Sequence, residues 1–252
     1  MKLFSFGMLS LALTTTAFAN GCPSKSKNAD EWIKYSDDQI RGESSDGRFS
    51  LEIETPEWKR TLEIKALVNG KDHSIVFIEN PPKEKGTGTL RIESQMWNYL
   101  PKLKRTVTIS PSMLLTSWMG SDFTNDDLLK ASSISGDYNH KFLADEKVDG
   151  ETYKVIENTS KDSAKVLWPR ILFYLSPTDC LPRMQKYFDN TKSLARTMKL
   201  SEVKTMDGHQ LPTVWVMQSE EKKNQKTTLR YTSVDFDVKF DAKTFTQQNL
   251  TK

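Results

Sequence analysis

Apolar and polar residues alternate along most of the chain, and this pattern predicts β-strands with one buried face. Every second side chain is apolar in residues 49–54, and the same period returns in residues 61–68, 73–78 and 89–93. Turn-forming residues such as glycine, asparagine and proline separate these runs. We therefore expect antiparallel strands that follow one another through hairpins.

Polar hairpin tips recur at intervals along the chain. The Asn-Gly pair at residues 69–70 has the sequence of a two-residue type I′ turn, and residues 149–150, 207–208 and 221–223 give further tips. The strands expected in the second half of the chain cover residues 138–145, 151–158, 170–175, 183–189, 193–204, 212–219 and 227–236. Together the runs predict a mainly β fold of roughly ten or eleven strands, in which a strongly curved antiparallel sheet forms an unclosed β-barrel.

The period of two breaks down in residues 96–129. Tryptophan, methionine and phenylalanine stand there among turn and cap signals, where a surface loop would be polar. A proline in the first turn and a stop at Gly120 predict a short helix over residues 110–119. Thr124, three positions before Asp127, forms a capping-box arrangement that begins a second helix. We interpret the two helices as a lid of short α-helices over an apolar face of the sheet.

Several strands are apolar on both faces, for example residues 75–78, 171–175 and 214–217. A strand in an antiparallel meander normally buries one face, so this excess allows two interpretations. One is a filled hydrophobic core that the helices roof. The other is a concave sheet face that movable helices cap, leaving an apolar cavity for a ligand, and the flexible methionine side chains favour it.

On the second interpretation, the binding residues come from the concave strands and the lid. They are Ile53, Leu62, Ile64, Trp97, Met113, Leu114, Trp118, Met119, Phe123, Leu128, Phe173, Met198, Trp215 and Met217. Gly120, Ser121 and Asp122 form the expected lid hinge, with Asp122 holding the closed lid through a backbone or arginine contact. The alternative for Asp122 is an ordinary turn aspartate that accepts a backbone N–H.

Residues 1–19 have the features of a secretory signal peptide. A lysine precedes an apolar stretch that is too short to span a bilayer, and small residues lead to a cleavage site after Ala19. We therefore expect export to the periplasm. Residues 20–252 lack a linker, an internal repeat or a low-complexity tract, so we expect one domain, with a short helix near its start over residues 29–40.

The two cysteines of the chain are Cys22 and Cys180. In an oxidising compartment they can form one disulfide, which would tie the mature N-terminus to the distant half of the chain; two unpaired thiols are the alternative. Cys22 lies close to the cleavage site, so a lipoprotein anchored at Cys22 is also weighed. Ala19 stands where a lipobox carries a large aliphatic residue, which favours soluble export.

Charge and motif content argue against several functional classes. The formal net charge is +3, and the lysines alternate with acids without forming a stripe, so no nucleic-acid surface is predicted. The three histidines lie beside turns and far apart, and we expect no metal and no cofactor. The sequence has no nucleophile elbow, P-loop or dinucleotide-binding glycine fingerprint, so we do not expect an enzyme.

Two segments carry a family resemblance. Residues 96–101 are Met-Trp-Asn-Tyr-Leu-Pro, and residues 119–128 are Met-Gly-Ser-Asp-Phe-Thr-Asn-Asp-Asp-Leu. They resemble the Trp-x-Tyr-x-Pro and Gly-Ser-Asp-Phe motifs of the outer-membrane lipoprotein-sorting proteins, a branch of the LolA-like superfamily. The resemblance extends over nearly all of the chain beyond the signal peptide.

This resemblance implies an unclosed β-barrel with a helical lid over a hydrophobic cavity. It also implies a carrier that accepts acyl chains of lipoproteins, or another lipid, at the inner membrane and releases them toward the outer membrane, with transient membrane contact. An inner-membrane transporter of the RND or ABC type is an implied partner. The alternative function is a non-enzymatic accessory subunit of an RND-type envelope exporter that has no lipid cavity.

Overall fold

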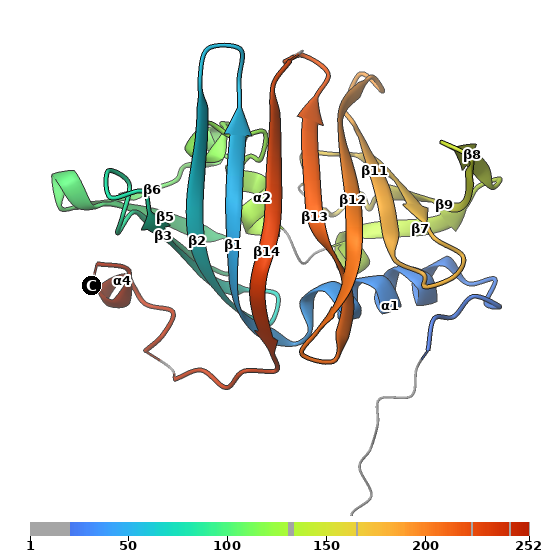
Figure 1. The fold of residues 1–252 in the computed structure, drawn as a ribbon, viewed down its shortest axis with the longest axis horizontal. Helices are drawn as coiled ribbons and strands as arrows, with labels where there is room; N and C mark the ends of the chain where they lie inside the picture. The colour runs from blue at the N-terminus through green and yellow to red at the C-terminus, as the bar shows by residue number, and fades with distance from the viewer. Residues whose placement is uncertain (1–20, 131–133, 165, 223, 242, 252) are drawn as a thin grey trace, which may run out of the picture.

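The computed structural model describes residues 21–130, 134–164, 166–222, 224–241 and 243–251, so the expected signal peptide and its cleavage site after Ala19 lie outside the described residues. One antiparallel sheet of fourteen strands dominates the fold and curves around a concave face (Figure 1). The strands are β1 (Ser44–Glu54), β2 (Lys59–Asn69), β3 (His73–Asn80), β4 (Gly88–Ile92), β5 (Gln95–Leu100), β6 (Arg105–Thr108), β7 (Tyr138–Phe142), β8 (Glu146–Val148), β9 (Glu151–Ser160), β10 (Arg170–Leu175), β11 (Pro182–Phe188), β12 (Leu194–Met206), β13 (His209–Ser219) and β14 (Lys226–Phe236). The helices are α1 (Ala29–Arg41), α2 (Asn125–Lys130), α3 (Ile134–Asp137) and α4 (Gln247–Leu250), with 3₁₀ turns η1 (Pro101–Leu103), η2 (Pro111–Met113) and η3 (Trp118–Gly120).

The chain enters the sheet in its middle. β1 pairs with β2 on one side and with β14 on the other. From β1 the chain runs strand by strand to one edge at β6, crosses to the opposite edge at β7, and returns through β9 to β14 beside its starting point. Within the described part of the chain, β6 and β7 are not hydrogen-bonded to each other, so the predicted unclosed, curved sheet is confirmed.

The crossing from β6 toward β7 runs along the concave side of the sheet (Figure 1). We call residues 109–130 the crossover segment. The second predicted helix is present as α2, but the helix expected over residues 110–119 is wrong. Two 3₁₀ turns replace it, because Met119 has a left-handed φ of 53° and Ser117 pairs with Thr124 in an isolated β-bridge. The segment therefore folds back on itself before α2 begins.

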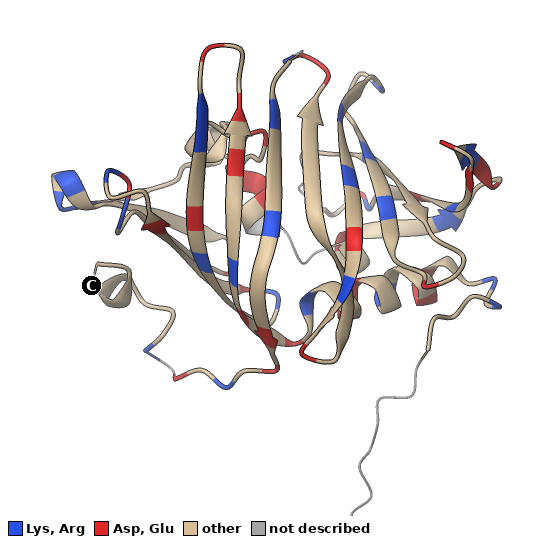
Figure 2. Cartoon of the chain, in the orientation of Figure 1, with Lys and Arg blue, Asp and Glu red and all other residues tan. Residues whose placement is uncertain are grey.

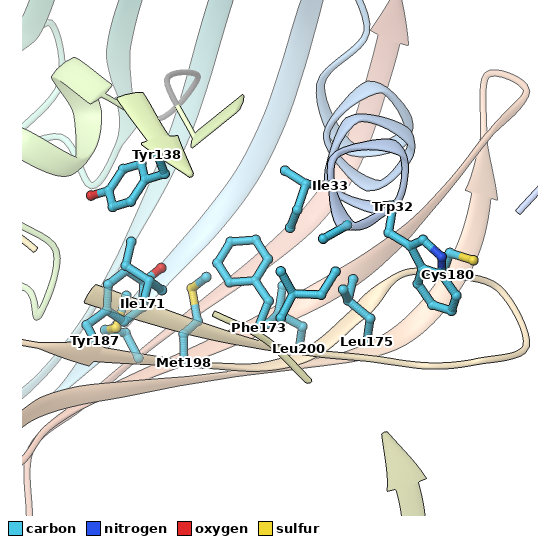
Figure 3. Close-up of a cluster of buried hydrophobic side chains, with 13 residues drawn as sticks. Trp32, Ile33, Tyr138, Ile171, Phe173, Leu175, Cys180, Tyr187, Met198 and Leu200 are labelled. Carbon is cyan, nitrogen blue, oxygen red and sulfur yellow. The ribbon is translucent and has the colours of Figure 1, made fainter. Parts of the chain in front are cut away.

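The helix expected over residues 29–40 is confirmed as α1. The side chain of Asn28 accepts a hydrogen bond from the Asp30 N–H and so caps its first turn, and Gly42, with a φ of 60°, ends it. Trp32 and Ile33 of α1 are buried. Figure 3 shows both side chains directed toward apolar side chains of the strands. The helix thus covers part of the concave face beside the crossover segment.

Inward-facing positions of alternating strands form the core. One buried cluster lies under α1 and includes Phe173, Leu200 and Met217 (Figure 3). A second lies under the crossover segment and includes Leu51 and Leu62. Outward-facing positions are largely charged, as in the ion pairs that Lys59 forms with Glu52 and Glu54 of β1. Figure 2 shows both signs of charge interspersed over the central strands.

The hairpin predicted at residues 69–70 is present between β2 and β3, but its two-residue type I′ turn is wrong. Asn69 pairs with His73, so the loop contains three residues, and Gly70 alone of the predicted pair has a positive φ. A type I′ turn needs positive φ at both central residues. Residues 149–150 and 207–208 meet that requirement. An acid–glycine pair supplies the left-handed conformations there, whereas the first loop has one extra residue.

The C-terminal segment covers the outer face of β3, β4 and β5. Phe245 and Leu250 pack with Ile75 and Leu90 in a cluster of their own. Leu90 points away from the concave side, because the preceding residue, Thr89, contacts the crossover segment and successive side chains of a strand face opposite ways. This covering segment and α4 had no counterpart in the sequence-based expectations.

Candidate functional site: an apolar cavity under the crossover segment

A cavity of about 220 Å³ lies between the concave face of the sheet, the crossover segment and α1. Apolar side chains form most of its wall, among them Ile33 from α1, Leu51 from β1, Phe173 from β10 and Leu200 from β12. Trp118 of η3, which is 5% exposed, reaches it from the crossover segment. The cavity thus borders both core clusters, and the segment that joins the two sheet edges covers it.

The α1 side of the cavity is fastened at both ends of the helix. Before the helix, a disulfide joins Cys22 to Cys180, with the two Cα atoms 5.4 Å apart. At its other end, the side chain of Gln39 accepts a hydrogen bond from the Gln210 N–H at 2.9 Å. One covalent bond and a link to the β12–β13 hairpin therefore hold this wall in place.

An ion pair joins α2 to β12 beside the cavity. Arg196, which is 3% exposed, donates to both carboxylate oxygens of Asp127, at 2.5 and 2.6 Å. Its guanidinium also lies 4.3 Å from the ring centres of Trp168 and Tyr187. Burial alone raises the pKa of Asp127, but the Arg196 charge and its hydrogen bonds outweigh burial and hold this pKa below its usual range. The pair is ionised and holds α2 against the sheet.

The predicted capping box is present at the start of α2. The Thr124 hydroxyl accepts from the Asp127 N–H at 3.2 Å, and the Asp127 carboxylate accepts from the Thr124 N–H at 2.7 Å. Asp127 thus occupies the position that a glutamate or glutamine usually takes in this motif, and it makes the same backbone hydrogen bond. Because the same carboxylate binds Arg196, helix capping and attachment to the sheet depend on one side chain.

Asp122 makes a second attachment, to the start of β14. Its carboxylate accepts from the Thr227 hydroxyl at 2.7 Å and from the Gln225 side-chain amide at 3.1 Å, and its N–H donates to the Thr227 hydroxyl at 2.9 Å. Burial raises the pKa of Asp122, and these hydrogen bonds only partly offset the rise. The arginine contact weighed for Asp122 is made by its carbonyl oxygen, 3.5 Å from the Arg196 guanidinium.

Two more strands hold η3. The Trp118 indole N–H donates to the Thr89 hydroxyl of β4 at 3.2 Å. The Arg60 guanidinium of β2 donates to the carbonyl oxygen of Met119 and pairs with Glu84 at 3.3 Å. Polar contacts thus tie the crossover segment to β2, β4, β12 and β14, and its apolar side chains, Trp118 among them, pack against the core beneath it.

The residues that the sequence predicts for the cavity and the hinge lie in different parts of the structure. Seven line the cavity: Trp118, Phe123, Leu128, Phe173, Met198, Trp215 and Met217. Ile53, Leu62 and Ile64 pack beneath the crossover segment, next to lining residues, and Met119 of that segment packs against the same cluster. The hinge residues Gly120, Ser121 and Asp122 lie in the same segment, where Gly120 has a φ of 76°.

The remaining three predicted residues lie away from the cavity. Trp97 faces the outer side of the sheet, where it packs in the cluster that the C-terminal segment covers, because it stands opposite Leu90 in the β4–β5 pairing. Leu114 packs with Met96 and Ile109. Met113 is 38% exposed on the outside of the crossover segment. Alternation placed Trp97 on one face of its strand without indicating which face is concave, whereas Met113 and Leu114 were expected on the helix that the 3₁₀ turns replace.

Sequence reasoning missed Arg196 and the aromatic rings around it. A signal was present, since Arg196 alternates with Met198 and Leu200 and therefore shares their inward face on β12. Tyr187 likewise shares a face with Gln185, and burial raises its pKa to about 12, so that it stays neutral. A cation in phase with buried apolar residues requires a buried counter-charge, but the sequence does not say which carboxylate supplies it.

Neither a metal site nor a membrane-spanning helix emerges from the described residues. No three of their histidine, cysteine, aspartate and glutamate side chains are grouped so that they could hold a metal ion. None of their helices is long and apolar enough to cross a bilayer.

Comparisons with known proteins place the chain among similar folds. A family model described as "uncharacterized protein" matches residues 70–252. No curated protein matches the chain. Three similar solved structures are a LolA superfamily protein from Nitrosomonas europaea (TM-score 0.76, 21% identity), a DUF1329 family protein from Desulfovibrio piger (0.79, 21%) and an outer membrane lipoprotein-sorting protein domain from Vibrio parahaemolyticus (0.74, 22%). Each similarity covers 89% of this chain and 100% of the other.

Proposed function

We propose that this chain, which belongs to the family whose model matches residues 70–252 and has the fold of the LolA superfamily protein and of the lipoprotein-sorting domain, is a carrier that shields acyl chains of lipoproteins or lipids in its cavity. The observation that carries the proposal is an apolar cavity covered by a segment outside the sheet, which side-chain contacts fasten to the strands. An acyl chain of about sixteen carbons costs on the order of 12 kcal/mol to move into water, at about 0.8 kcal/mol per methylene. A protein that moves such a chain between membranes must therefore enclose it, and no covalent chemistry is needed.

Cargo entry requires the crossover segment to act as a lid. The cavity volume of about 220 Å³ is below the range of about 300–1,000 Å³ that is usual for ligand pockets, so the present arrangement corresponds to the closed state. Opening separates Asp127 from Arg196 and Asp122 from Thr227, with the backbone turning at Gly120, Ser121 and Asp122. The disulfide-held α1 stays in place, which directs the opening to the crossover side.

We place this carrier in the periplasm after cleavage behind Ala19. The disulfide supports this location, because disulfides persist in oxidising compartments. It also opposes a lipid anchor at Cys22, since the sulfur that would carry the lipid is bonded to Cys180. We propose an inner-membrane RND-type or ABC-type transporter as the donor of cargo, delivery toward the outer membrane, and a role without catalysis or cofactors.

Two measurements test the carrier. Protein purified from the periplasm under native conditions is analysed by lipid mass spectrometry, and the delipidated protein is titrated with a fluorescent fatty acid. We expect co-purified lipid and saturable binding. The Trp118→Glu variant should lose at least about tenfold in affinity, because it places a charge in an apolar wall. The matched control is Met113→Glu, which adds the same charge to an exposed position outside the lining and should bind like the parent.

The alternative is an accessory subunit of an envelope exporter that carries no lipid. Absence of co-purified lipid together with no fatty-acid binding by the folded parent would establish that alternative over the carrier. Equal loss of affinity in the Trp118→Glu and Met113→Glu variants would place the binding site outside the cavity.

A further inference from the structure

Two neighbouring loops carry a concentration of unpaired cations. They are the β3–β4 loop (residues 81–87) and residues 101–105, which comprise the β5–β6 connection and the first residue of β6, and we call them the basic loops. Their exposed cationic side chains are Lys83, Lys85, Lys102, Lys104 and Arg105. Within the part of the chain that the structure describes, none of the five has an ion-pair or hydrogen-bond partner. The one carboxylate of the basic loops, Glu84, is paired with Arg60 at 3.3 Å.

The basic loops lie together at one end of the sheet. β3 and β5 run in the same direction, so the connections that follow them emerge on the same side. A Cβ built on Gly86 would lie 3.7 Å from the Cβ of Pro101, so the two loops lie side by side. Figure 2 shows basic residues gathered at this projecting end, around η1, in contrast to the mixed charges of the central strands. The five positive charges therefore act as one patch.

One exposed apolar side chain lies among these cations. Leu103, in η1 between Lys102 and Lys104, is 68% exposed. A single exposed leucine has little meaning by itself. Surrounded by cations, however, it gives the combination that holds proteins on anionic lipid surfaces, where basic groups approach the phosphates and an apolar group enters the interface.

We propose that the basic loops are a docking surface for an anionic phospholipid bilayer, with the cations against the lipid phosphates and Leu103 inserted among the headgroups. A bilayer fits better than an acidic protein, because the cations are flexible and surround one protruding side chain, without a groove that would orient a specific partner. β6 leads from these loops directly into the crossover segment. Docking would therefore bring the cover of the cavity close to the membrane.

The test is flotation of the cargo-free protein with vesicles. Vesicles of phosphatidylglycerol and phosphatidylethanolamine should bind it, and vesicles of phosphatidylcholine alone should not. Binding to the anionic vesicles should weaken about tenfold between 50 and 500 mM salt, because the Debye length shortens. The variant Lys83→Glu with Lys102→Glu, which changes one cation in each loop, should lose binding. Leu103→Ser should weaken binding while keeping its salt dependence.

The matched control is Lys141→Glu with Lys147→Glu. It makes the same change in net charge at exposed positions of β7 and β8, at the opposite edge of the sheet, and should bind anionic vesicles like the parent. Equal loss in the two double variants would overturn the proposal and attribute binding to net charge. Absence of vesicle binding by the folded parent would also overturn it and leave an acidic protein surface as the partner. Since no cargo is present, neither result depends on the carrier function.

Discussion

Two carboxylates of the crossover segment, the buried Asp122 and the half-buried Asp127, have pKa values shifted in opposite directions. Asp127 has a cationic partner in Arg196, and its pKa is lowered. Asp122 bonds mainly to a hydroxyl and an amide, which are weaker compensation, so burial dominates and its pKa is raised. The folded structure therefore stabilises the ionised form of Asp127, which attaches the segment firmly. It destabilises the ionised form of Asp122 relative to the unfolded chain.

Replacing Asp127 should destabilise the protein strongly. Asp127→Asn leaves the buried Arg196 without its counter-charge, and we expect a loss of about 3 kcal/mol in the free energy of unfolding, measured in urea. The control is Asp38→Asn, which removes one partner of the exposed Lys34–Asp38 pair and should change stability by less than about 0.5 kcal/mol. Similar losses in both variants would show that the Asp127–Arg196 pair has no special part in stability.

Asp122 should give a characteristic pH dependence. Its folded-state pKa is raised above the ordinary value of 3.8, so the folded protein holds the proton more tightly than the unfolded chain does. The resulting stability is fully present below the unfolded pKa and is lost as the pH rises through the folded pKa. We therefore expect the parent to gain stability relative to Asp122→Asn as the pH is lowered from 7 to about 4. A difference between the two that does not vary with pH would contradict the assigned environment.

At the scale of elements, the crossover segment differs from the sheet that it covers. Ladders of backbone hydrogen bonds hold the strands, whereas four sets of side-chain contacts hold this segment to β2, β4, β12 and β14. Segments with few backbone hydrogen bonds to their surroundings open at lower free energy than the core does. The same sheet can therefore keep its shape while its cover moves.

A substitution at the expected hinge tests this difference. Gly120 has a φ of 76°, a conformation that costs other residues about 1–2 kcal/mol. Gly120→Ala should therefore speed amide hydrogen exchange in residues 118–127 without changing exchange in the central strands. Gly136→Ala is the control, because its backbone does not need a left-handed φ and a Cβ there meets open space. Faster exchange throughout the sheet in the Gly120 variant would mean that the segment does not open by itself.

At the scale of the whole molecule, the chain's path explains why its two ends need fastening. It enters at the centre of the sheet and leaves there, so neither β1 nor β14 is an edge strand. The residues before β1 turn under the concave face as α1, and those after β14 cover the outer face. The disulfide holds the first of these segments to the β10–β11 connection, across 158 residues of sequence.

Removal of the disulfide should affect stability and binding together. The double variant Cys22→Ala with Cys180→Ala removes the cross-link between positions 158 residues apart. The unfolded chain is then less constrained, and we expect a loss of about 2–4 kcal/mol in the free energy of unfolding. Because α1 lines the cavity through Ile33, fatty-acid affinity should fall as well. The parent treated with reductant should resemble the double variant, and the variant itself should not respond to reductant. Unchanged affinity in a clearly destabilised variant would show that α1 is not a needed wall.

Local patterns were enough to predict most strands, the helices α1 and α2, and the general fold. A period of two fixes an extended backbone with two faces, and the Thr124–Asp127 spacing fixes a cap, because both depend on residues a few positions apart. The prediction failed where contacts from elsewhere shape the backbone. Met119 takes a left-handed conformation in the fold-back beside the Ser117–Thr124 bridge, and a predicted helix becomes two turns.

The sequence by itself determined a curved antiparallel sheet, its apolar inner positions and a covering segment with an N-cap. Tertiary structure alone decided which face became the wall of a cavity. Alternation separates Trp97 from Met96 but does not say that Trp97 lies outside. It also decided that Arg196 meets Asp127, 69 positions away. A buried charge requires a partner, yet only the folding of the sheet and its crossover brings the two together.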